Sequence, residues 1–188
     1  GRARGAARGA AGRLPPATRR AAPLSAVRLA LTRDALARHS GLADFAFAMQ
    51  GLGAGPISLF GTPEQKARHL PGVAAGRTLA AFALSEKAAG SDVAAIATTA
   101  RREGEHYVLD GEKSWISNAG VAGLHVVFAR TGEAPGAKGL SAFIVEAETP
   151  GFAVSEIVEL SAPHPLGSLR FEGCRIPASS MIGAPGEG

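Results

Sequence analysis

Apolar positions follow a helical spacing in the first part of the chain. Between residues 24 and 76, Leu24, Val27 and Leu31 recur at intervals of three and four. The segment 41–50 (GLADFAFAMQ) is apolar almost all round, which is typical of a helix buried on more than one face. We therefore expect this part to be all-α, with further helices supplied from elsewhere to cover it.

Two local signals predict where these helices end and begin. The stretch GLGAGP at 51–56 is expected to break the chain, because glycine and proline disfavour a helix interior. Thr62 and Gln65 form the pattern of a capping box, with Pro63 at the first helical position. A short helix is therefore predicted to start there and to run toward Gly76.

The spacing changes after residue 76 to short apolar runs separated by turns. The segment 107–116 predicts two strands around Asp110 and Gly111, because Asp-Gly is a strong hairpin signal. Further runs occupy 79–84, 125–129, 140–145, 152–155 and 169–171. The predicted fold class is α+β: a tail over 1–23, an N-terminal all-α helical segment over 24–78, and an antiparallel β-barrel or sandwich domain over 79–188.

Charge is distributed unevenly along the chain. Residues 1–23 carry six arginines and no acidic residue, which leaves 14 basic and 16 acidic residues in the remainder. Such an Arg/Ala/Gly-rich tail is expected to be disordered. Without interleaved aromatic residues or a binding module, it does not predict a nucleic-acid partner. A targeting peptide and a wrongly assigned start of the reading frame are alternative interpretations of this segment.

Composition argues against metal and membrane functions. Cys174 is the only cysteine and the five histidines are scattered, so we expect no metal site. No apolar stretch approaches the ~20 residues of a membrane span, and no secretory signal is recognisable. We therefore expect a cytoplasmic protein with no membrane partner.

Two apolar runs end in hydroxyl-bearing residues. One is AFALSEKAAGSD at 81–92, and the other is WISN, which begins at Trp115. An indole can cover one face of a planar aromatic cofactor, while hydroxyls and backbone N–H groups bond its edge. Gly90 and Ser91 could form a backbone nest for phosphate. Taken singly, Trp115 is more simply a core residue and the serines are ordinary turn residues; the two strand tips together favour a shared ligand.

Nucleotide motifs of the common types are absent from the sequence: neither GxGxxG nor GxxxxGK[ST] occurs. ALSEKAAGSD, then WISN about thirty residues later, then LRFEGCRIPASSMIG instead resemble the acyl-CoA dehydrogenase family in order and spacing. The resemblance extends upstream through GLGAGPISLFGTPEQKARHLPGVAAG and covers about residues 30–188.

This resemblance implies a helical domain, a β-barrel-like domain and a C-terminal four-helix domain that together bind FAD. It also implies oxidation of the Cα–Cβ bond of an acyl-CoA, electron transfer to an electron-transfer flavoprotein, a place in fatty acid metabolism, and a homo-oligomer when full length. Phe82, Leu84 and Ser85 would lie along the isoalloxazine ring, with the Ser85 hydroxyl on its pyrimidine edge.

The second strand tip and the glycine turn receive roles by the same resemblance. Trp115 would lie against the flavin face with Ile116 beside it, and Ser117 would bond near N5. Gly90 and Ser91 would meet the FAD pyrophosphate, and Ser91 could also contact the CoA side of the substrate. Such fixed donors would stabilise the negative charge of reduced flavin.

The sequence departs from the family pattern at several positions. Ser85 and Ser117 replace the commoner threonines, which keeps each hydroxyl but loses a methyl group that limits its rotamers. Lys87 stands where proline is usual, and APHPLG at 162–167 replaces the usual stretch, so the acyl preference is open.

The catalytic base of the family lies in its C-terminal domain, and the sequence ends at Gly188 where that domain would begin. None of Glu86, Asp92, Glu112 or Glu146 stands at the motif position of the base. No catalytic residue is predicted, and we expect the chain alone to be inactive. The alternatives are a non-catalytic module that binds flavin, acyl-CoA or a partner, and a same-fold acyl-CoA or nitroalkane oxidase.

Overall fold

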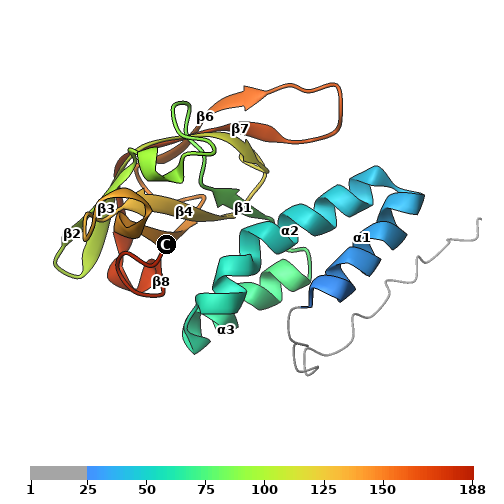
Figure 1. The fold of residues 1–188 in the computed structure, drawn as a ribbon, viewed down its shortest axis with the longest axis horizontal. Helices are drawn as coiled ribbons and strands as arrows, with labels where there is room; N and C mark the ends of the chain where they lie inside the picture. The colour runs from blue at the N-terminus through green and yellow to red at the C-terminus, as the bar shows by residue number, and fades with distance from the viewer. Residues whose placement is uncertain (1–24) are drawn as a thin grey trace, which may run out of the picture.

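A computed structural model describes residues 25–188, so the tail predicted over 1–23 lies outside the described residues. Three helices come first: α1 (Ala26–His39), α2 (Gly41–Phe60) and α3 (Pro63–Ala74). They gather at one side of the molecule, and the strands that follow form the other side (Figure 1). The predicted order of helices followed by strands is confirmed.

Eight strands form one sheet in the order β6-β7-β3-β2-β4-β5-β8, with β1 paired to β4. Their bounds are β1 (Ala80–Ala83), β2 (Thr99–Glu103), β3 (His106–Ser117), β4 (Leu124–Arg130), β5 (Leu140–Glu146), β6 (Phe152–Val158), β7 (Leu166–Pro177) and β8 (Met181–Ile182). Three short 3₁₀ helices, η1 (Val93–Ala95), η2 (Gly136–Gly139) and η3 (Ala178–Ser180), lie between strands.

The predicted α+β class is confirmed, and most neighbouring strands pair antiparallel as expected, but the sheet as a whole is mixed. Strand β1 pairs in parallel with β4, from Ala80 opposite Leu124 to Ala83 opposite Val127. Parallel neighbours need a long connection that brings the chain back to the same end of the sheet. The segment 84–123, which includes β2 and β3, provides that connection.

Asp110 and Gly111 do not form the predicted hairpin turn. They lie inside the continuous strand β3, where the register with β7 shifts. Gly111 has a φ of 141°, and a Cβ at this position would lie 2.7 Å from Oγ1 of Thr98. The glycine therefore permits a close approach of the neighbouring segment within a bulge. The hairpin turn lies earlier, at Gly104, and follows strand β2. Strand β2 was not predicted because its sequence, TARRE, is mostly polar.

Helix α2 continues through residues 51–56, where a break was predicted. A Cβ at position 53 would lie 2.6 Å from the carbonyl carbon of Ala80, so Gly53 allows the helix to approach β1 closely. The capping box is confirmed at α3: the Gln65 backbone N donates to Oγ1 of Thr62 over 3.2 Å, and the Thr62 N donates to Oε1 of Gln65 over 3.0 Å.

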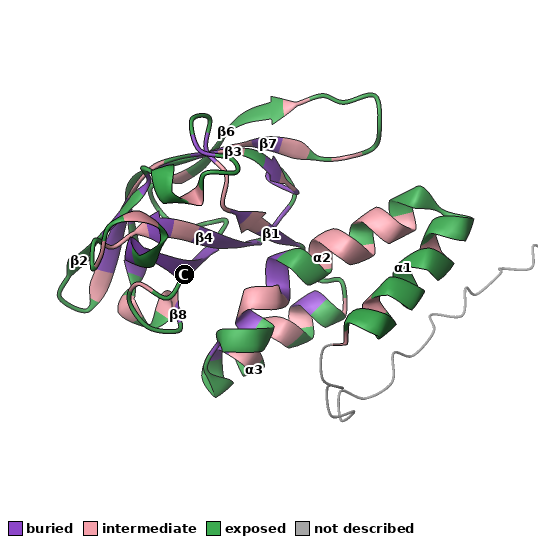
Figure 2. Ribbon diagram, viewed as in Figure 1, coloured by how far each residue is buried: buried purple, intermediate pink, exposed green. Residues whose placement is uncertain are grey.

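Buried side chains concentrate in the strands and at the contact of α2 with β1 (Figure 2). The larger apolar cluster fills the strand region and includes Leu109, Phe143 and Phe171. A second cluster joins Ile57 and Val73 of the helices to the sheet. Of the residues in α2, only Gly53, Ala54 and Ile57 are buried, and the apolar segment 41–50 is exposed or half-buried, so the helices expected to cover it are not among the described residues.

Candidate functional site

The two predicted strand tips lie side by side. The backbone N of Ser114 in β3 donates to the carbonyl oxygen of Ser85 over 2.9 Å, which joins the end of β1 to β3. A hollow of about 180 Å³ lies between these tips and α2. Its walls are formed by Met49, Leu52, Ala80, Ala81, Phe82, Leu84, Ser85, Trp115, Ile116 and Ser117. The structure thus brings together six of the eight predicted site residues.

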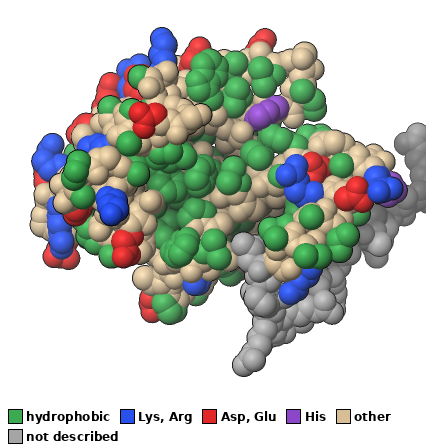
Figure 3. All heavy atoms as spheres, viewed as in Figure 1, with side chains coloured by type: hydrophobic (Ala, Val, Ile, Leu, Met, Phe, Trp, Pro, Cys, Tyr) green, Lys and Arg blue, Asp and Glu red, His purple; other side chains and the backbone are tan. Residues whose placement is uncertain are grey.

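Trp115 is an exposed residue at a bulge. Its side chain is 60% exposed, so the interpretation as a core tryptophan is wrong. Its φ is 62°, and the pairing register of β3 with β7 shifts between Lys113 and Ile116. A non-glycine residue in the left-handed region costs on the order of 1–3 kcal/mol, and such strain is common at ligand sites. In the view of Figure 3, hydrophobic side chains gather over the middle of the molecule.

Ser117 has a side-chain partner that the sequence analysis did not identify. Its Oγ lies 2.8 Å from Nε2 of His164, in the loop between β6 and β7. The His164 ring packs on the Phe45 ring of α2, with centroids 4.4 Å apart. The same loop accepts a hydrogen bond at the Pro165 carbonyl from the backbone N of Asn118 over 2.8 Å. The unusual stretch APHPLG was the available signal, since it places a histidine where the family has other residues.

Gly90 and Ser91 are not among the residues that line the hollow. They are exposed and lie in a turn after the bridge between Glu86 and Ala89. Ala89 donates its backbone N–H to the Glu86 carbonyl over 3.1 Å, so this N–H group is already used. The phosphate role of Gly90 and Ser91 stays a prediction.

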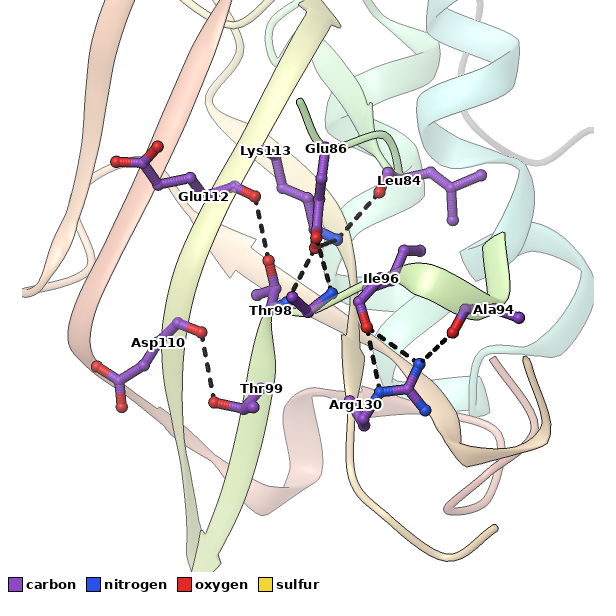
Figure 4. A network of polar contacts seen from close by, with 11 residues as sticks. Leu84, Glu86, Ala94, Ile96, Thr98, Thr99, Asp110, Glu112, Lys113 and Arg130 are labelled. Atoms are coloured by element: carbon purple, nitrogen blue, oxygen red, sulfur yellow. Dashed lines mark hydrogen bonds and ion pairs between the residues drawn. The ribbon is translucent and has the colours of Figure 1, made fainter. Parts of the chain in front are cut away.

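Glu86 is the centre of a buried polar network (Figure 4). Its Oε1 lies 2.8 Å from Nζ of Lys113, and the side chains are 9% and 0% exposed. The same carboxylate accepts the backbone N–H groups of Ala97 over 2.7 Å and Thr98 over 2.9 Å. Lys113 also donates to the carbonyl oxygen of Leu84 over 3.0 Å. This carboxylate after the β1 tip therefore holds three segments together.

The charges of this pair follow from their surroundings. Burial by itself would raise the pKa of Glu86, but the hydrogen bonds from Lys113, Thr98 and Ala97 outweigh it and lower the pKa below its usual value. Burial lowers the pKa of Lys113, and the attraction of Glu86 opposes that shift. An ionised carboxylate with this many partners is a structural anchor rather than a free base.

Sequence comparison decides the family. The family profile "Acyl-CoA dehydrogenase, middle domain" matches residues 81–174, and "Acyl-CoA dehydrogenase, N-terminal domain" matches residues 6–77. The chain belongs to the acyl-CoA dehydrogenase family. This chain is 44% identical over 136 residues to human mitochondrial short-chain specific acyl-CoA dehydrogenase, an alignment that covers 71% of the chain and 33% of that protein. The chain spans between 33% and 40% of the length of these curated relatives.

Solved structures of similar fold agree with this assignment. A structure described as the FAD complex of PigA has a TM-score of 0.84 and 32% identity, covering 89% of this chain and 45% of that one. The structure of butyryl-CoA dehydrogenase from Megasphaera elsdenii has a TM-score of 0.79 and 33% identity, covering 84% of this chain and 42% of that one.

Within residues 25–188, no group of three or more histidine, cysteine or acidic side chains is arranged to hold a metal ion. None of the described helices has the length and apolar character needed to cross a bilayer.

Proposed function

We propose that this chain forms part of an FAD-dependent acyl-CoA dehydrogenase and provides one wall of its flavin site. The observation that carries the proposal is Trp115, an exposed indole held at positive φ beside the hydroxyls of Ser85 and Ser117. Family membership and the similarity to a flavin complex support it.

The residues present fit the isoalloxazine part of FAD. Phe82, Leu84 and Ile116 give the hollow apolar walls, and the Trp115 indole offers a flat surface for one ring face. Ser85 and Ser117 supply hydroxyls at the edge. When bound, FAD would supply the hydride-accepting chemistry, and the protein groups would orient the ring and stabilise its charge. Gly90 and Ser91 are proposed to contact the pyrophosphate, with Ser91 also near the CoA.

No aspartate or glutamate lines this hollow in the described part of the chain. Glu86, the carboxylate nearest in sequence to the β1 tip, is fully engaged by Lys113 and two backbone N–H groups. Removal of the α-proton of an acyl-CoA therefore requires a base beyond these lining residues. For the chain in isolation, this favours flavin or acyl-CoA binding without turnover as the second candidate function.

Partners of the whole protein belong to the same proposal. An acyl-CoA is the proposed substrate, an electron-transfer flavoprotein is the proposed electron acceptor, and the full-length protein is proposed to self-associate. Similarity to a human short-chain acyl-CoA dehydrogenase supports the first of these.

Replacement of Trp115 tests the proposed site. Trp115→Ala removes the apolar cover of one ring face, which is worth on the order of 2–3 kcal/mol, so the Kd for FAD should rise roughly thirtyfold or more. Phe60→Ala is a matched control, because Phe60 is also an exposed aromatic residue but lies outside the hollow. Calorimetric titration with FAD measures both variants. Equal Kd values for wild type and Trp115→Ala would show that the flavin site is elsewhere.

A further inference from the structure

The hydroxyl of Ser117 forms a hydrogen bond with a residue that does not line the hollow. Ser117 lines the hollow, whereas His164 does not, yet its Nε2 lies 2.8 Å from the Ser117 Oγ. This is the only hydrogen bond of the Ser117 hydroxyl within the described part of the chain. His164 is therefore placed to act on a ligand through Ser117 rather than by contact.

The histidine is itself fixed by neighbours from two elements. Its ring packs on Phe45 of α2, with centroids 4.4 Å apart and planes tilted by 52°. Its backbone N donates to the Ala162 carbonyl over 2.7 Å, and the next residue, Pro165, accepts from Asn118 at the end of β3. These contacts set the position of the imidazole relative to Ser117 before any ligand binds.

Serine needs such a restraint more than threonine does. Threonine has a second heavy substituent on Cβ that restricts χ1, and serine lacks it. A serine hydroxyl in an open hollow can therefore turn among three staggered positions. The hydrogen bond with His164 selects the one in which Oγ points at the imidazole, and so compensates for the missing methyl group.

The direction of this hydrogen bond determines what Ser117 offers to a ligand. A neutral imidazole has one N–H donor and one acceptor nitrogen. If Nε2 accepted the Ser117 proton, the hydroxyl could only accept from a ligand. If Nε2 carries the proton and donates to Oγ, the hydroxyl keeps its own proton for an acceptor in the hollow. The edge of oxidised isoalloxazine presents acceptors at N1, O2, O4 and N5, and a single donor at N3.

We propose that His164 is a positioning residue that donates from Nε2 to Ser117 Oγ and thereby makes the Ser117 hydroxyl a donor toward an acceptor atom of the ligand. For a flavin ligand this inference rests on the proposed function. It assigns a specific task to the stretch at 162–167: the orientation of a donor at the flavin edge.

The first arm of the test needs no flavin. In the ligand-free 188-residue chain, ¹⁵N NMR at a pH where the imidazole is neutral should show His164 with a protonated Nε2. Ser117→Ala should shift that resonance, while His106 should be unaffected, because His106 lies at the opposite end of β3 and contacts Arg175. An unprotonated Nε2 on His164 would overturn the proposal.

The second arm measures FAD binding and the absorption spectrum of the bound flavin. His164→Phe keeps a ring against Phe45 but removes the donor, so affinity should fall about threefold to tenfold and the spectrum should shift. His164→Gln can return an N–H to the Nε2 position and should restore both readouts. Adding Ser117→Thr to His164→Phe should recover part of the loss, because the methyl group again limits the rotamer. His106→Phe is the matched control and should change neither readout.

The outcomes separate the two proposals. If wild type binds FAD and His164→Phe binds it with the same Kd and spectrum, the positioning role is overturned while the proposed function stands. If wild type shows no FAD binding, the proposed function fails, and the NMR arm alone decides whether His164 donates to Ser117. Thermal midpoints of each variant show that losses do not come from unfolding.

Discussion

The Nζ atom of Lys113 lies 2.8 Å from Oε1 of Glu86, with both side chains buried. Lys113 belongs to β3 and Glu86 to the turn after β1, so this pair joins the two strands whose tips form the candidate flavin site. Ser85 immediately precedes Glu86, so the charge pair anchors the chain next to a residue that lines the hollow.

Lys113→Met should destabilise the fold strongly. Removing one partner of a buried pair leaves an uncompensated charge, which costs on the order of 3–5 kcal/mol of unfolding free energy. Urea unfolding followed by circular dichroism measures the change. Arg68→Met is the control: it breaks the ion pair with Glu146, in which the arginine is 71% exposed, and should cost no more than about 1 kcal/mol. Similar losses for the two variants would contradict a buried role for Lys113.

Signals confined to a few neighbouring residues could be predicted from the sequence. The capping box at Thr62 and Gln65 depends only on contacts within one helical turn, and it forms as predicted. The convergence of Ser85, Trp115 and Ser117 could also be predicted, because the family motifs specify their relative positions.

Long-range contacts explain the errors. Glycine in α2 indicates a break on propensity alone, but close packing of Gly53 on Ala80 stabilises the continuous helix. The pair Asp110-Gly111 is as compatible with a bulge as with a tight turn. Only the close approach of Thr98, which is distant from any local pattern, distinguishes the two. The unusual stretch APHPLG singles out His164, but its partner Ser117 lies 47 positions away, so the sequence does not indicate that the two meet.

Gly53→Ala should destabilise the protein, because the added Cβ would lie 2.6 Å from the Ala80 carbonyl carbon. Overpacking of this kind costs about 1–3 kcal/mol. Gly55→Ala is the matched control in the same helix, since a Cβ there has no neighbour within 4 Å. It should stabilise the helix by up to about 1 kcal/mol. Chemical unfolding of both variants measures these opposite changes in unfolding free energy. An unchanged unfolding free energy in Gly53→Ala would show that α2 does not pack closely on β1.

His125 should make stability depend on pH. It is 0% exposed, and burial lowers its pKa from 6.5 to about 4. Between those values the unfolded chain binds the proton and the folded chain does not. The unfolding free energy should therefore fall by about 3 kcal/mol as the pH decreases from 6.5 to 4.

Urea unfolding at a series of pH values measures this dependence. His125→Leu should reduce the slope, because leucine does not titrate. His39→Ala should leave it unchanged, since His39 is exposed at the end of α1. An unchanged slope in His125→Leu would assign the pH dependence to other groups.

The 188-residue chain with added FAD should not reduce an electron-accepting dye when saturated acyl-CoAs are supplied. The hollow has no lining carboxylate among the described residues, and loss of a general base typically lowers a rate by ~10²–10⁴. A full-length relative assayed in parallel serves as the positive control. Robust acyl-CoA-dependent dye reduction by the chain would require a base among its own residues.

Trp115 is the only tryptophan of the chain and lines the proposed flavin site, so its fluorescence reports directly on the central claim. An isoalloxazine ring stacked on the indole should quench this emission. Titration of the wild-type chain with FAD should give saturable quenching, after correction against free tryptophan amide at the same FAD concentrations. Quenching no greater than that of the free amide would contradict the placement of flavin at these strand tips.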